Sequence, residues 1–99
     1  MVNLYLDDVR ACPKNFLLVT SYDEFVNFIR HRGFPNFISF DHDLGLGKTG
    51  YDCAKFLVEY CLEKQLDLPC FFVHSQNPVG KLNIESLLKN FQKFQKKEK

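Results

Sequence analysis

The stretch NFISFDHD, residues 36–43, joins a short apolar run directly to three polar residues. Its apolar part is rich in the β-branched and aromatic residues that favour strands, and Pro35 precedes it. A continuous apolar run of this length, without polar alternation, is typical of a strand buried in a parallel sheet. The stretch therefore predicts a buried strand over residues 36–40 that ends at Asp41.

Three more apolar runs are expected to form strands: VNLYL at 2–6, FLLVT at 16–20 and PCFFV at 69–73. Two helices are predicted between the later strands, over residues 21–33 and 49–64. Each begins with Ser or Thr followed three residues later by an acidic residue, which is the pattern of a capping box. A third, amphipathic helix is expected from Ile84 onward, after a loop over residues 77–83.

Strands that alternate with helices predict an α/β fold, here a doubly wound parallel sheet of four strands in the order 2-1-3-4 with helices on both faces. Residues 8–15 are too few for a regular crossover helix, so the first connection should hold one or two helical turns at most. Ninety-nine residues suffice for one domain with one core. We therefore expect a single domain over residues 1–99, with a short basic tail from about residue 95.

Composition and charge bound the classes of function. The formal net charge of +1 provides no overall field for nucleic acid. The four cysteines match no C-x-x-C or zinc-binding spacing, so they are predicted to be reduced thiols. The chain shows neither an apolar run near the length of a membrane span nor a signal-like leader, and we expect a soluble, cytoplasmic protein without a membrane partner.

GLGKTG, residues 45–50, fits the spacing of a dinucleotide-binding motif and ends like a phosphate-binding P-loop. A P-loop would need glycine where the chain has His42. A dinucleotide motif should follow its strand almost directly, whereas four residues intervene and two of them are carboxylates that repel a pyrophosphate. We interpret the glycines as residues that let the loop turn tightly, with Gly45 available as a backbone donor to a phosphate.

Polar residues after parallel strands meet at the carboxyl edge of the sheet, where ligands bind. His42 and His74 are expected to point into one crevice beside Asp41, so that one histidine acts as general base and the other as general acid. Three carboxylates are candidate ligands for Mg²⁺, which prefers oxygen donors: Asp7, Asp8 and Asp43. Four groups are candidates for binding phosphate or substrate: Arg10, Ser75, Asn77 and Gly45. The alternative is that the acidic residues only cap loops and helices.

With LYLDDVR, ISFDHDLG and FFVHSQNPVGKLNI placed at strand ends, residues 2–95 resemble the receiver-domain superfamily, and in particular its divergent branch of cyclic-phosphate processing receiver domains. The resemblance implies a flavodoxin-like fold. It matches Asp7 and Asp8 to the acidic pair after the first receiver strand, Asp41 to the phospho-accepting aspartate and Ser75 to the switch hydroxyl.

The chain departs from that pattern because no fifth strand is expected. The lysine that receivers carry on that strand has no evident counterpart, and Lys81 is the nearest substitute. The two histidines, His42 and His74, are instead the mark of the divergent branch.

The resemblance implies processing or hydrolysis of a cyclic phosphate on a small phosphorylated ligand or an RNA end, with paired-histidine catalysis. Two alternatives stay open. One is a Mg²⁺-dependent phosphohydrolase with Asp41 as nucleophile and Asp43 as acid. The other is a degenerate receiver that binds a ligand or a signalling partner without turnover, although no protein partner is evident from the sequence.

Overall fold

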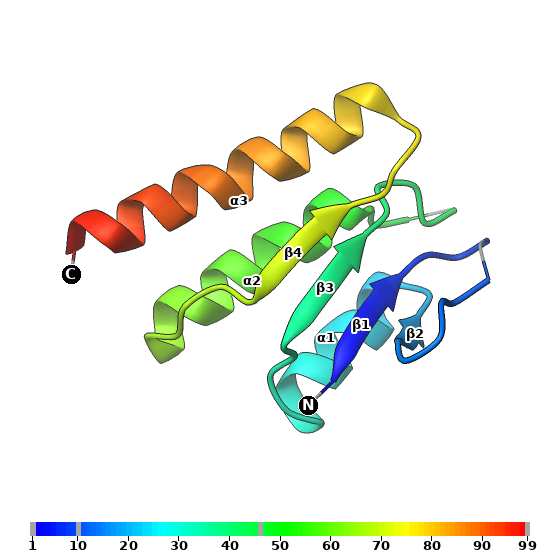
Figure 1. The fold of residues 1–99 in the computed structure, drawn as a ribbon, viewed down its shortest axis with the longest axis horizontal. Helices are drawn as coiled ribbons and strands as arrows, with labels where there is room; N and C mark the ends of the chain where they lie inside the picture. The colour runs from blue at the N-terminus through cyan, green and yellow to red at the C-terminus, as the bar shows by residue number, and fades with distance from the viewer. Residues whose placement is uncertain (1, 10, 46, 99) are drawn as a thin grey trace.

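The computed structural model describes residues 2–9, 11–45 and 47–98 (Figure 1). These residues form a four-stranded parallel sheet in the order β2-β1-β3-β4. The strands are β1 (Asn3–Leu6), β2 (Leu17–Val19), β3 (Phe37–Phe40) and β4 (Cys70–Val73). Their last residues pair with one another across the sheet, so the strands end level. The predicted α/β class, strand number and strand order are confirmed, and the described residues contain no fifth strand.

The helices are α1 (Tyr22–His31), α2 (Gly50–Lys64) and α3 (Pro78–Glu98). The first two begin where the capping signals predicted. The Ser21 side chain accepts a hydrogen bond from the backbone N–H of Glu24. Thr49 and Asp52 form a reciprocal capping box, each side chain accepting from the backbone of the other. Local polar side chains therefore determine where α1 and α2 start.

Helix α3 begins earlier than predicted. Residues 78–83, expected as a loop, form its first turns. The side-chain oxygen of Asn77 accepts a hydrogen bond from the N–H of Gly80 at 3.0 Å, and Pro78 occupies the first helical position, where its missing N–H is not needed. The basic run from about residue 95, predicted to be a tail and a frayed helix end, forms the last part of this same helix.

The three helices lie on one face of the sheet. Figure 1 shows α1 and α2 behind the strands and α3 alongside α2 and β4. The two crossovers β2–α1–β3 and β3–α2–β4 run in the same direction across the sheet, and right-handed crossovers of one direction place their helices on one face. The strand residues that face them are fully buried: Leu4, Leu6, Ile38, Phe40 and Val73. Among the described residues, the expectation that helices cover both faces is therefore wrong.

Aromatic side chains cover part of the other face. The β1–β2 connection contains no helix in its described residues, 7–9 and 11–16, but the ring of Phe16 packs edge-on against Tyr5 and Phe37, with ring centroids 5.9 Å apart in both pairs. Phe72 and Leu18 remain 56% and 40% exposed. This second face is therefore partly open beside the carboxyl ends of the strands.

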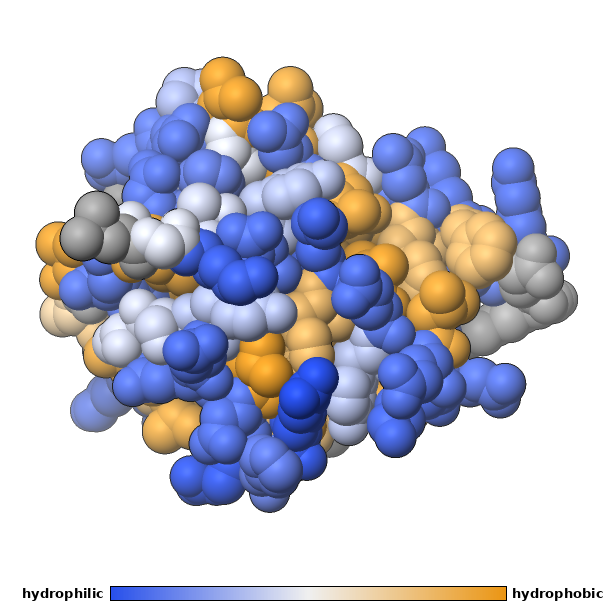
Figure 2. All heavy atoms as spheres, turned by 180° about the vertical axis from the view of Figure 1, so that it is seen from behind, coloured by the Kyte–Doolittle hydropathy of each residue, from blue (hydrophilic) through white to orange (hydrophobic). Residues whose placement is uncertain are grey.

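Figure 2 shows the molecule from behind, the side on which α1 and α2 lie, and hydrophilic side chains predominate there with smaller apolar areas between them. Within the part of the chain that the structure describes, no helix has the length and apolar character to cross a membrane.

Candidate functional site

The carboxyl ends of β1, β3 and β4 bring Asp7, Asp41 and His74 together. Each residue follows its strand directly, and because the strands end level, the three side chains meet on the partly open face. One donor atom from each lies within 4.8 Å of the other two. Asp7 and the His74 side chain are buried, at 1% and 8% exposure, while Asp41 is half-buried. We call these three residues the Asp7–Asp41–His74 cluster.

The ring of His74 is held on three sides. Its Nε2 lies 2.9 Å from Oδ2 of Asp7, and its Nδ1 lies 2.7 Å from Oγ of Ser39. The Tyr5 ring stacks on it, with centroids 4.4 Å apart and planes 3° from parallel. An ionised carboxylate can only accept, so Nε2 donates to Asp7, and in the neutral ring the Ser39 hydroxyl then donates to Nδ1. These contacts fix the orientation of the His74 ring.

Backbone amides anchor both carboxylates of the cluster. Oδ1 of Asp7 accepts a hydrogen bond from the N–H of Val9, and Oδ1 of Asp41 accepts one from the N–H of His42, both at 2.8 Å. The anchored oxygens restrict how far either carboxylate can rotate. The cluster is therefore preorganised by its own local backbone.

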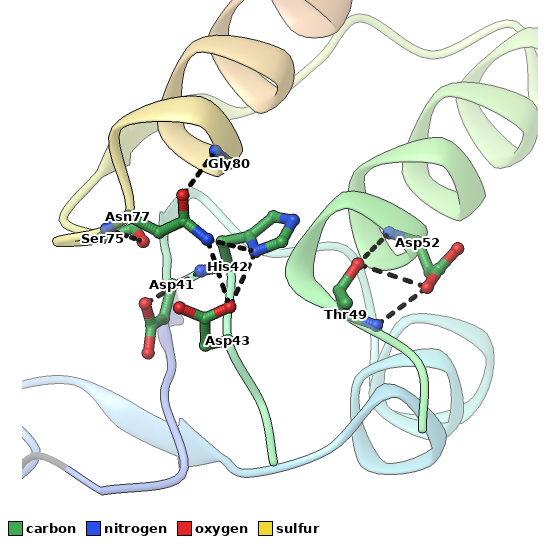
Figure 3. A network of polar contacts seen from close by, with 8 residues as sticks. All are labelled: Asp41, His42, Asp43, Thr49, Asp52, Ser75, Asn77 and Gly80. Carbon is green, nitrogen blue, oxygen red and sulfur yellow. Dashed lines mark hydrogen bonds and ion pairs between the residues drawn. The ribbon is translucent and has the colours of Figure 1, made fainter. Parts of the chain in front are cut away.

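His42 belongs to a second group of polar side chains, shown in Figure 3. Its Nδ1 donates to Oδ1 of Asp43 at 3.0 Å, and the side-chain amide of Asn77 donates to the same oxygen at 3.4 Å. The hydrogen bond from His42 lowers the pKa of Asp43 below its ordinary value, and the one from Asn77 adds to this. The His42 ring packs so closely on Gly80 that a Cβ there would overlap it. This group joins the loop after β3 to the first turn of α3.

The two histidines therefore lie in different groups. Figure 3 shows the His42 ring and the Asp41 carboxylate pointing away from each other, and Asp41 is the residue that lies with His74. Successive residues of an extended chain point to opposite faces of a sheet, which separates neighbours in sequence. The prediction that His42 and His74 face one crevice does not hold in this structure.

The other predicted residues occupy varied positions. Asp8 is exposed and lies against the loop at Gly45, whose Cβ position would be 3.2 Å from the Asp8 carboxylate. Ser75 is buried, and its hydroxyl accepts the N–H of Asn77 at 3.1 Å in the turn before α3. Arg10 lies outside the described residues. Of the predicted magnesium ligands, only Asp7 belongs to the cluster.

Sequence reasoning missed Ser39 and Tyr5. Both lie inside strands, two residues before Asp41 and Asp7, and so share the face of the cluster. Ser39 is the one polar residue in the strand FISF, and that exception to an apolar run was the available signal.

The cluster suits a divalent cation. Carboxylate oxygens and imidazole nitrogen are common ligands of such ions. The 2.9 Å between Asp7 Oδ2 and His74 Nε2 is near the separation of neighbouring ligands around an octahedral ion, about 3.0 Å for bonds of about 2.1 Å. Asp7, Asp41 and His74 are therefore the residues that could hold a cation.

Lys81 lies against β4. Its ammonium nitrogen is 5.9 Å from the centre of the Phe72 ring, on the exposed side of that strand. The role of Lys81 as the substitute for the receiver lysine stays a prediction.

A parallel β2-β1-β3-β4 sheet with aspartates directly after β1 and β3 defines a receiver-like α/β domain. The family model described as the cyclic-phosphate processing receiver domain matches residues 2–90. The chain therefore belongs to this family. Neither the curated proteins nor the solved structures contain a match to it.

Proposed function

We propose that this chain hydrolyses a cyclic phosphate at the Asp7–Asp41–His74 cluster with the help of a divalent cation. The family supplies the class of substrate. The observation that supports the site is the convergence of two carboxylates and an imidazole within 4.8 Å at the carboxyl ends of three strands.

Electrostatics favours a cation at this place. Two carboxylates alone would repel a phosphate, and the repulsion is strong where the groups are shielded from water. A divalent cation held by Asp7, Asp41 and His74 would offset that repulsion and polarise a phosphoryl oxygen.

We assign His74 to binding the cation, with Asp7 and Ser39 in contact with its two ring nitrogens. The Asp41 carboxylate is half-buried, whereas that of Asp7 is 1% exposed, so of the two carboxylates we assign to Asp41 the contact with the attacking water. As the water oxygen bonds to phosphorus, one ring P–O bond breaks. Asp41 passes the proton of the water to the leaving oxygen, and the product is a phosphomonoester with a free hydroxyl.

The test is turnover of 2′,3′- and 3′,5′-cyclic nucleotides and of RNA with a cyclic-phosphate end, followed by ³¹P NMR. We expect activity that EDTA abolishes and Mn²⁺ restores, with Asp41→Asn and His74→Ala reducing it at least about 100-fold. His31→Gln is the matched histidine control, because His31 is exposed at the end of α1. Turnover that survives both cluster substitutions would refute the proposal.

His42→Gln separates this mechanism from paired-histidine catalysis. If the cluster does the chemistry, His42→Gln lowers the free energy of unfolding and has little effect on turnover per folded molecule. If two histidines share the catalysis, it abolishes turnover as fully as His74→Ala does.

The position of Asp41 also favours a second candidate function, a receiver-type phosphoryl acceptor. It directly follows β3 and lies beside the acidic residue after β1, which is the arrangement of the receiver phospho-acceptor. Labelling with acetyl phosphate, read as a mass increase at Asp41 that Asp41→Asn removes, tests this function. The same labelling would report Asp41 as the nucleophile of a phosphohydrolase.

A further inference from the structure

We propose that Ser39 is a positioning residue that makes His74 a nitrogen ligand, so that the cluster prefers Mn²⁺, Co²⁺ or Zn²⁺ to Mg²⁺. The inference rests on the cation in the proposed function and not on the cyclic-phosphate substrate. It concerns what the chain itself does to the histidine ring.

Ser39 lies in the middle of the sheet. It is 5% exposed, and its hydroxyl oxygen is 2.7 Å from Nδ1 of His74. A buried hydroxyl without a partner is unfavourable, so the contact accounts for a serine in an otherwise apolar strand. The Tyr5 ring, stacked on the imidazole, keeps the ring from tilting out of this contact.

The proton on the ring must change place when a cation binds. With Asp7 ionised and the ring neutral, Nε2 carries the proton and donates a hydrogen bond to Asp7, and Nδ1 accepts one from Ser39. A cation among the three cluster residues needs the lone pair of Nε2, so the proton must then lie on Nδ1. The Ser39 hydroxyl can turn from donor to acceptor, because a hydroxyl does both. The ring therefore changes tautomer without moving.

An imidazole ligand changes which cations the site favours. Mg²⁺ prefers oxygen ligands and gives up its water reluctantly, whereas Mn²⁺, Co²⁺ and Zn²⁺ accept nitrogen more readily. Alanine at position 39 would leave the Nδ1 proton of the loaded ring without its acceptor. Loss of such a supporting partner typically weakens metal binding by about 10- to 100-fold.

The experiment measures binding of MnCl₂ and of MgCl₂ to the full chain by calorimetry, without substrate. We expect the natural chain to bind Mn²⁺ more tightly than Mg²⁺. Ser39→Ala should lose about 10- to 100-fold in affinity for Mn²⁺ and less in affinity for Mg²⁺. Ser39→Thr, which keeps the hydroxyl, should recover most of the loss. Ser75→Ala is the matched control. Ser75 is also a buried serine, at 8% exposure, but its hydroxyl accepts from a backbone amide.

NMR of the ¹⁵N-labelled ring reports the tautomer directly and needs no variant. We expect the His74 proton on Nε2 in the free chain and on Nδ1 after addition of ZnCl₂. Equal affinity for Mn²⁺ and Mg²⁺, an unchanged Ser39→Ala protein, or a proton that stays on Nε2 in the Zn²⁺-loaded chain would each overturn the inference. A chain that shows the preference but turns over no cyclic phosphate would refute only the proposed function.

Discussion

Gly80→Ala should destabilise the chain through the ring of His42. The added Cβ would overlap Cγ of His42 and lie 2.6 Å from its Cδ2. The ring cannot move aside freely, because its Nδ1 donates to Asp43. The added Cβ should therefore disturb the hydrogen bonds among His42, Asp43 and Asn77, which join the β3 loop to α3.

The expected loss of stability is the balance of two unfavourable effects and one favourable effect. Overpacking a filled position costs about 1–3 kcal/mol, and loss of the hydrogen bond to Asp43 adds about 1 kcal/mol. Alanine in a helix in place of glycine contributes up to about 1 kcal/mol in the opposite direction. We expect Gly80→Ala to lower the free energy of unfolding by about 1–3 kcal/mol.

A double-variant cycle in urea, followed by circular dichroism, separates the contact from other causes. In His42→Ala/Gly80→Ala the overlapping ring atoms are absent and only the Cβ of residue 42, 2.7 Å from the added Cβ, remains close, so the Gly80→Ala change should cost less in that background than in the natural chain. Gly50→Ala is the contrasting variant, since its Cβ would overlap the backbone oxygen of Asp41, which removal of the His42 ring cannot relieve.

Additivity would refute the reasoning. If the double variant loses the sum of the two single losses, the His42 ring does not lie against Gly80, and the assignment of His42 to the second group fails with it.

Three further predictions concern capping and thiols. Thr49→Ala removes one half of the capping box of α2 and should lower the free energy of unfolding by about 1 kcal/mol in thermal denaturation, and an unchanged midpoint would contradict the cap. The hydrogen bond from the backbone N–H of Thr49 lowers the pKa of Asp52 below its ordinary 3.8. The carboxylate therefore stabilises the fold above pH 3.8, and this stabilisation is lost as the pH falls through the lower pKa of the folded chain. The difference in free energy of unfolding between the natural chain and Asp52→Ala should disappear in that acidic range and not near neutral pH. Iodoacetamide at pH 8, followed by mass spectrometry, should label the exposed Cys70 first and leave Cys53 and Cys61 unmodified. Burial raises the pKa of both buried thiols, that of Cys61 to about 12, so neither forms a reactive thiolate at this pH. Early labelling of Cys61 would show that the core opens.

The strands and two of the three helix starts could be predicted because their causes are local. Apolar runs of four or five residues, and side chains that cap the next turn, lie within a few residues of what they determine. The start of α3 was missed although its signals, Asn77 and Pro78, are local too. Amphipathic periodicity indicated only the part of that helix from Ile84, because its first turn buries little apolar surface.

The open face of the sheet followed from topology and not from any residue. The β1–β2 connection runs opposite to the other two crossovers, and its described residues hold no helix. On this face of the sheet, aromatic side chains such as Phe16 provide part of the cover. The length of that connection was visible in the sequence. Its consequence depended on the direction of every other crossover.

The sequence by itself determined that Asp7, Asp41 and His74 would meet, because parallel strands that end level bring the residues directly after them to one edge. Only the tertiary structure decided that the His42 ring packs against Gly80 of α3 and not beside the cluster, and that Ser39 forms a hydrogen bond with His74 from within the sheet. Adjacent polar residues after a strand look equivalent in sequence. The alternation of side chains and the packing of α3 send them to opposite sides, and α3 with the preceding Asn77 lies more than thirty residues away along the chain.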